Sequence, residues 1–131
     1  MIILTTYRIN PKILDPKMHY VHVNELKTLN LEIREESVSS GFLASTAKDL
    51  TGLSGTLIFK RHSDGEAFDR DLVIVDASDG LVSYTFVEAD FDDFTVGSYS
   101  LCVQLKNISD ELVFEEELTC CPPFEVKESC T

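Results

Sequence analysis

The sequence has 131 residues, of which 44% are hydrophobic, and 23 acidic against 11 basic residues give a formal net charge of −12. This length fits one domain with a single core, and the apolar content excludes an intrinsically disordered chain. A surface this acidic repels phosphate groups, so the charge argues against nucleic acids and anionic membranes as partners.

The first 19 residues stand apart from the rest of the chain and are punctuated by Pro11 and Pro16. No basic segment precedes their apolar start, and no apolar run approaches the length of a membrane-spanning helix. We therefore expect a chain made in the cytoplasm, with residues 1–19 forming an extended arm. The apolar side chains of this arm are candidates for contacts with other chains: Ile2, Ile3, Leu4, Tyr7 and Ile9.

Short strand signals separated by turn residues fill residues 20–128, and residues 129–131 form a tail. Apolar and polar residues alternate strictly over residues 29–34, which places Leu29, Leu31 and Ile33 on one face of a strand. Residues 35–48 are expected to form a loop. Further strands are expected over residues 55–61, 72–75, 81–87, 99–106, 112–119 and 124–126.

Turn chemistry joins these segments, most clearly at residues 76–80, which end in Asp79-Gly80. Residues 88–95 are acidic and aromatic and are expected to hold no more than one short helical turn. Six or seven short strands with such turns predict an all-β antiparallel sandwich. Tyr99 is expected in its core, at a corner of the sandwich, with a hydrogen-bonded hydroxyl.

The four cysteines are Cys102, Cys120, Cys121 and Cys130. They crowd into the last third of the chain, and no signal sends them to an oxidising compartment, so reduced thiols are expected. A disulfide between Cys102 and Cys120 remains an alternative. Zinc is disfavoured because adjacent cysteines on a strand point to opposite faces.

Calcium is a second alternative, because Asp90, Asp92 and Asp93 share one segment and Asp76 and Asp79 form another pair. Neither group has EF-hand spacing, and turns favour aspartate for backbone reasons alone. We therefore predict no metal and no cofactor. The sequence also lacks a nucleophile elbow and a phosphate-binding glycine loop, so we predict that the protein is not an enzyme.

Several short elements follow one another in an order typical of a known family. They are Asp49-Leu50-Thr51-Gly52, residues 55–60, Asp64-Gly65, Ile74-Val75-Asp76, residues 80–84, Gly97-Ser98-Tyr99 and Phe124-Glu125-Val126. Over roughly residues 22–128, this order resembles the N-terminal domain of the siphophage baseplate upper protein family and its short stand-alone relatives. The resemblance implies an immunoglobulin-like sandwich of about seven strands, built into a virion, with no catalytic residues.

The sequence departs from this family after Val126, where the long C-terminal portion of the family does not follow. That departure favours a small adaptor, a decoration protein or a fibre anchor of the head, neck, tail or baseplate. We expect such a protein to form homo-oligomers and to bind other virion structural proteins through its N-terminal arm and exposed strand edges.

The alternative function is a module that binds a glycan or protein of the host surface. Such sites often use exposed aromatic side chains in loops. Phe91 and Phe94 of the acidic segment are the first candidates, followed by Tyr20 and Phe42. The structural interpretation, which we favour, is that these aromatic side chains close the ends of the sandwich.

Overall fold

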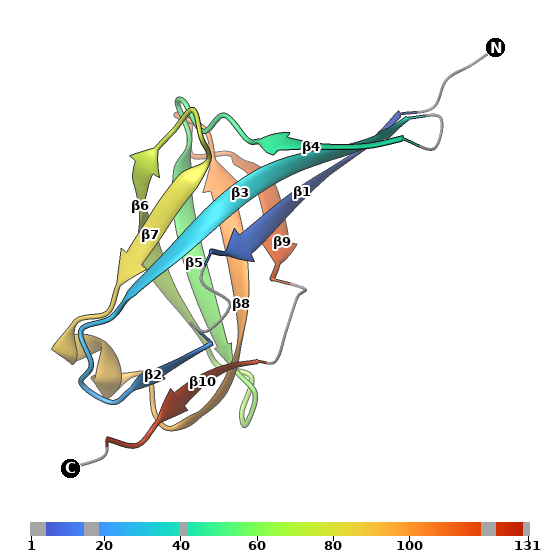
Figure 1. Ribbon diagram of the computed structural model, residues 1–131. Helices are drawn as coiled ribbons and strands as arrows, with labels where there is room; N and C mark the ends of the chain where they lie inside the picture. The colour runs from blue at the N-terminus through green and yellow to red at the C-terminus, as the bar shows by residue number, and fades with distance from the viewer. Residues whose placement is uncertain (1–4, 15–18, 40–41, 119–122, 130–131) are drawn as a thin grey trace.

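The computed structural model describes residues 5–14, 19–39, 42–118 and 123–129 (Figure 1). Within them lie ten strands and one short 3-10 helix. These are β1 (Thr5–Ile13), β2 (Tyr20–His22), β3 (Thr28–Ser39), β4 (Phe42–Ala47), β5 (Ser54–Arg61), β6 (Ala67–Asp76), β7 (Leu81–Thr85), η1 (Glu88–Asp92), β8 (Gly97–Lys106), β9 (Leu112–Glu117) and β10 (Phe124–Lys127). The predicted all-β fold is confirmed. In this part of the chain, no helix is long and apolar enough to cross a membrane.

The strands form one sheet that curls into two layers, in the order β1-β3-β7-β6-β5-β8-β10-β2. Strand β6 belongs to both layers, because residues 67–72 pair with β5 and the residues from Val73 onward pair with β7. Strands β9 and β10 both pair antiparallel with β8, at its opposite ends. Strand β2 pairs parallel with β10.

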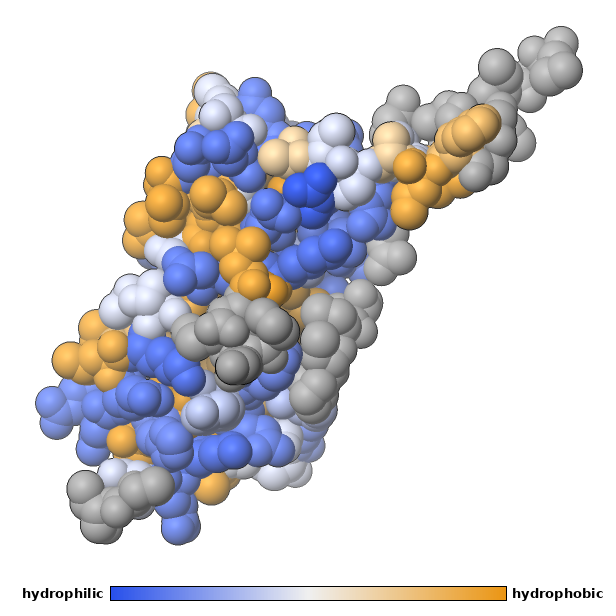
Figure 2. Space-filling model, viewed as in Figure 1, coloured by the Kyte–Doolittle hydropathy of each residue, from blue (hydrophilic) through white to orange (hydrophobic). Residues whose placement is uncertain are grey.

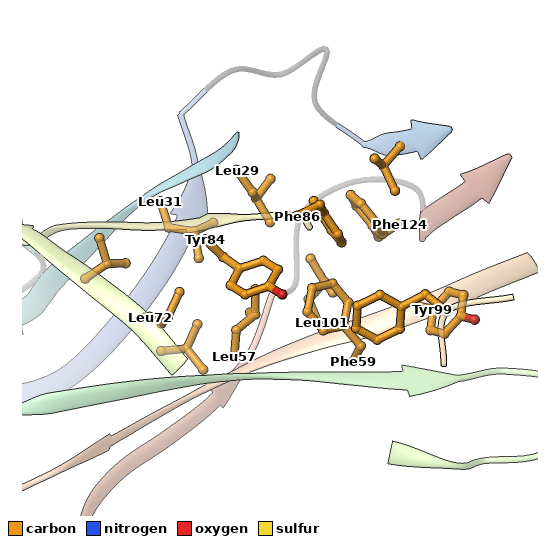
Figure 3. Close-up of a cluster of buried hydrophobic side chains, with 14 of the residues drawn as sticks. Leu29, Leu31, Leu57, Phe59, Leu72, Tyr84, Phe86, Tyr99, Leu101 and Phe124 are labelled. Atoms are coloured by element: carbon orange, nitrogen blue, oxygen red, sulfur yellow. The ribbon is translucent and has the colours of Figure 1, made fainter. Parts of the chain in front are cut away.

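The core lies between the two layers and is rich in aromatic side chains (Figure 3). The inward residues of β3 and β8 follow the alternation expected from the sequence, and Leu31, Ile33, Tyr99 and Val103 are fully buried. The ring of Phe59 lies 4.6 Å from that of Phe94 and about 6 Å from those of Tyr84, Phe86 and Phe124, measured between centroids. This aromatic cluster fills the end of the sandwich nearest η1.

Strand β1, which lies within the predicted arm, belongs to the sheet rather than standing apart from it. Strand β1 pairs antiparallel with β3 from Thr5 to Ile13, Pro11 is buried, and Ile13 packs against the core. Pro11 is tolerated because its partner Ile33 directs its backbone groups to the other side of β3, toward Gly80 and Lys48. No ladder hydrogen bond is therefore lost at the proline.

The expected loop over residues 35–48 is wrong. Strand β3 continues to Ser39, and β4 returns antiparallel along it, with Ser39 opposite Phe42 and Arg34 opposite Ala47. Residues 42–46 are exposed and residues 34–37 are half-buried, so neither segment has a fully buried face. Their sequence therefore lacks the apolar alternation that marks a strand with one buried face.

Gly80 ends the turn between β6 and β7 and has a positive φ of 68°. A Cβ at this position would lie 2.4 Å from the carbonyl oxygen of Ile33 and 3.0 Å from that of Lys48. Both neighbours are backbone atoms, so they cannot move away as a flexible side chain would. Gly52 has a similar φ of 78° but open space around its Cβ position.

We expect Gly80→Ala to lower the free energy of unfolding by about 3 kcal/mol, because it combines backbone strain with a steric clash. Gly52→Ala is the matched control and should lower it by only about 1 kcal/mol, the strain of the left-handed backbone alone. Equilibrium denaturation in urea measures both values. Equal losses for the two variants would contradict this account of Gly80.

Candidate assembly surface

Three strands continue beyond the sandwich as a projecting ribbon (Figure 1). We define the ribbon as residues 5–10 of β1, residues 34–39 of β3 and residues 42–47 of β4. Strand β3 is its central strand, and Glu36 pairs with Arg8 on one side and with Ser45 on the other. The ribbon exists because β3 has twelve residues, more than the sandwich needs to cover its core.

The far end of the ribbon exposes apolar side chains on both faces. Phe42 is 79% exposed, Leu43 is 69% exposed and Val38 is 44% exposed. Val38 and Leu43 are direct cross-strand partners and share one face, whereas Phe42 belongs to the other. Figure 2 shows this apolar end projecting from a largely hydrophilic ribbon. Neighbouring exposed apolar side chains of this kind are typical of an interaction surface.

The outer edge of β4 is open, since among the described residues β4 pairs only with β3. The amide of Lys48 donates to the carbonyl of Ile33 at 2.9 Å, which fixes the phase of the ladder. Backbone groups alternate sides along an antiparallel strand. Those of Phe42, Ala44 and Thr46 therefore face β3, and those of Leu43, Ser45 and Ala47 face outward.

Arg34 reaches across β4 to this open edge. Its Nε donates to Ser45 Oγ at 2.7 Å and its Nη2 donates to the Ser45 carbonyl at 2.8 Å. Its Nη1 pairs with Glu32 at 3.1 Å. The central carbonyl of the open edge is thus occupied by a charged side chain, which is one way in which proteins protect exposed strand edges.

A second feature is a shallow depression of about 490 Å³ on the outer face of β5, β8 and β9. Lys60 and His62 lie on one side of it, Glu115 and Glu117 lie on the other, and Cys102 lines it between them. Burial, followed by the negative charges of the two glutamates, raises the pKa of the Cys102 thiol to about 11. The thiol is therefore protonated at neutral pH and is a poor nucleophile.

His62 also contacts Ser100 in this depression, at 2.7 Å between Nε2 and Oγ. A catalytic serine–histidine pair requires a third group that orients the imidazole. Glu115, one of the two acids in the lining, accepts a hydrogen bond from Gln104 at 2.9 Å. The depression has the character of a polar surface with both signs of charge.

The residues proposed for the assembly arm lie in different parts of the chain. Ile2, Ile3 and Leu4 lie outside the described residues. Tyr7 belongs to β1 within the ribbon, opposite Ser37, and Ile9 packs against the core.

Cys120, Cys121 and Cys130 also lie outside the described residues, and so does the Cys102–Cys120 pairing; Cys102 itself is a free thiol.

No sequence pattern identified the residues that form the ribbon edge, namely Arg34, Val38, Leu43 and Ser45. One signal was available. Residues 42–47 carry no charge in a chain of which 26% is charged. Uncharged stretches of this kind occur in loops as well, so the signal alone does not identify an edge strand.

Phe91 and Phe94 are not exposed loop aromatics, and this prediction is wrong. Phe94 is 1% exposed and belongs to the core, and the half-buried Phe91 stacks on Phe86 with 6.0 Å between ring centroids. They close one end of the sandwich, as the structural interpretation of these side chains predicted. Tyr99 lies nearby in the core, and its hydroxyl donates to the Thr95 carbonyl at 2.7 Å.

Asp90 anchors this closed end rather than offering free oxygens to a cation. It is 4% exposed, and its Oδ1 accepts a hydrogen bond from Arg70 Nε at 2.8 Å. Its Oδ2 accepts from the Tyr84 hydroxyl and from the Val87 amide. Arg70 also pairs with Asp93 at 2.9 Å. Across the described ranges, no three potential ligand side chains cluster as a metal site would require.

The pKa of Asp90 reflects two opposing effects. Burial alone raises it, but hydrogen bonds from Tyr84, Val87 and Arg70 lower it further than burial raises it, so the folded pKa lies below its ordinary value. The carboxylate therefore stabilises the fold fully above pH 5. This contribution is lost as the pH falls from about 4 through the depressed folded pKa.

We expect Asp90→Asn to lower the free energy of unfolding at pH 7 by about 3 kcal/mol, because it leaves the half-buried Arg70 without its buried partner. The difference from the original protein should shrink as the pH falls below 4. Asp92→Asn, in the same helix but exposed, should leave stability unchanged. Urea denaturation between pH 3 and pH 7 measures both, and a loss for Asp90→Asn that is independent of pH would contradict the account.

Comparison with known proteins adds no family to this description. No protein-family model matches the chain, and no curated protein matches it. The candidate surface is therefore defined by its own geometry: a projecting ribbon with an apolar end and an open edge strand, of which Arg34 covers the centre.

Proposed function

We propose that this chain is a structural protein of a bacteriophage virion and acts by protein–protein assembly through the ribbon. The observation that carries the proposal is the ribbon itself, in which an open edge strand and exposed Phe42 and Leu43 project from a folded body. Apolar side chains that remain in water do not stabilise the folded monomer, and neighbouring ones often mark an interaction site. An open edge satisfies its backbone groups by adding a strand of a partner.

The proposed fold is immunoglobulin-like, and the strand order supports it. The order β1-β3-β7-β6 corresponds to strands A, B, E and D of immunoglobulins, and β5-β8-β9 corresponds to C, F and G. The hydrogen bond from the Tyr99 hydroxyl to Thr95 has the form of a tyrosine corner at the start of strand F. An immunoglobulin-like sandwich is also what the resemblance to the phage baseplate family implies.

The alternative function, a host-surface binding module, has less support. Phe91 and Phe94 are committed to the end of the sandwich. The ring of Tyr20 is covered by Lys27 and Lys127, whose ammonium groups lie 4.1 and 4.5 Å from its centroid. Of the aromatic candidates, Phe42 remains widely exposed, and it belongs to the ribbon.

Substitution tests this function better than truncation. Deleting residues 1–16 would remove β1, including buried Pro11 and the core contacts of Ile13, and would damage the sandwich. Phe42 and Leu43 lie outside the core, so replacing them should not affect folding.

We expect a Phe42→Ser and Leu43→Ser double variant to fold with its free energy of unfolding changed by less than about 1 kcal/mol, because both side chains are exposed. It should fail to enter virions when it replaces the original chain in the phage. Immunoblotting of purified particles measures incorporation. The matched control is Val73→Ser with Val75→Ser, which removes two valines of β6 that are 61% and 60% exposed. Equal incorporation of both double variants would refute the proposal.

A further inference from the structure

We propose that the partner of the open β4 edge is β4 of a second copy of this chain, paired antiparallel about a two-fold axis. The inference rests on the proposed function in using the ribbon as the assembly surface, and it adds the identity of the partner. Three features lead to it: the phase of the backbone groups, the charge of the ribbon and the position of Arg34.

The backbone groups of one β4 edge complement those of another. Leu43, Ser45 and Ala47 direct both an amide and a carbonyl outward. If Ser45 lies opposite Ser45 of the second copy, Leu43 faces Ala47 in both directions, and the two edges exchange about six hydrogen bonds. Such a self-complementary contact closes as a dimer, in contrast to a head-to-tail contact, which continues.

The charge distribution favours the ribbon over the rest of the surface for contact between copies. The chain has a net charge of −12, so two copies repel each other wherever their bodies meet. By sequence, the ribbon ranges 5–10, 34–39 and 42–47 contain two arginines and two glutamates, which sum to zero. The whole excess of negative charge therefore belongs to the remainder of the chain.

The length of the ribbon keeps the acidic bodies apart in such a dimer. Six strand residues span about 20 Å, and antiparallel pairing places the two bodies at opposite ends of the paired ribbons. Physiological salt screens charges over roughly 8 Å, so repulsion between the bodies is weak at this separation. β4 itself places no charge at the contact, and the side chains of Leu43 and Ala47 become neighbours across it.

Arg34 has a defined role in this arrangement. In the single chain it occupies the Ser45 carbonyl, the acceptor at the centre of the proposed contact. Pairing with a second β4 requires this hydrogen bond to be replaced by one from the amide of the partner strand. Arg34 thus competes with association and protects the edge while the chain is alone.

Sedimentation velocity of the full chain over a wide concentration range tests the inference. We expect a reversible monomer–dimer equilibrium for the original protein and for Ser45→Ala, which keeps the backbone of the edge. Ser45→Pro should stay monomeric, because proline removes an outward amide. It should keep its fold, since that amide makes no bond to β3. Association of Ser45→Pro equal to that of Ser45→Ala would overturn the inference.

A second variant covers the case in which the proline disturbs β4. Ser45→Lys places two ammonium groups opposite each other in the dimer, so it should weaken association. In the monomer the new side chain is exposed and lies opposite Glu36 of β3, which tolerates a positive charge. Circular dichroism and urea denaturation verify folding of each variant. Undiminished association of a folded Ser45→Lys protein would also overturn the inference.

Arg34→Ala tests the competing hydrogen bond. We expect it to tighten association by about tenfold, the equivalent of one charge-assisted hydrogen bond that no longer needs to be broken. Unchanged or weaker association would show that Arg34 does not compete with the partner strand.

The inference and the proposed function fail in different ways. A chain that is monomeric at every concentration, while the Phe42→Ser and Leu43→Ser variant is still excluded from virions, would overturn the second-copy partner and leave the assembly function standing. A dimer that Ser45→Pro abolishes, with normal incorporation of the Phe42 and Leu43 variant, would support the pairing and overturn the assembly function.

Discussion

The two backbone hydrogen bonds of Ile33 set the architecture of this protein. Its amide donates to the Gly80 carbonyl at 2.7 Å, and its carbonyl accepts from the Lys48 amide at 2.9 Å. Before this residue in the sequence, β3 pairs with β7 and belongs to the sandwich. After it, β3 pairs with β4 and belongs to the ribbon. The close approach leaves no room for a side chain at position 80. The junction between body and ribbon is therefore a continuous, hydrogen-bonded strand rather than a loop.

The same strand changes its chemistry at this junction. Leu29, Leu31 and Ile33 face the core, and the next residues on that face are Glu35 and Ser37. Both residues are half-buried, and Ile9 of β1, opposite Glu35, still packs against the core. The exposed apolar side chains return only at the end of the ribbon, in Val38, Phe42 and Leu43. Their position far from the core gives them a surface role rather than a packing role.

The acidic character of the chain has two structural consequences. Inside the sandwich end, Asp90 and Arg70 form a pair that is satisfied by Tyr84 and Val87, so one acid is used to fasten the helix η1 to the core. On the surface, the remaining acids give the body a large negative charge, whereas the charges of the ribbon sum to zero. In the proposed dimer, contact through the ribbon and repulsion between the bodies would together favour a defined contact over general aggregation.

The sequence by itself determined the fold class and most of the core, because apolar alternation at period two identifies a strand with one buried face, as in Leu29, Leu31 and Ile33 or Tyr99, Leu101 and Val103. It also placed the turn at Gly80 and favoured Phe91 and Phe94 as the closure of one end. Only the tertiary structure decided that residues 35–48 form strands and that β1 belongs to the sheet, because a ribbon exposed on both faces has no such alternation. The contact of Arg34 with Ser45 was beyond sequence reasoning for a related reason. It depends on which strand lies beside β3 and in what register. Every residue type can make the backbone hydrogen bonds of that pairing, so the sequence of a strand without a buried face carries little sign of it.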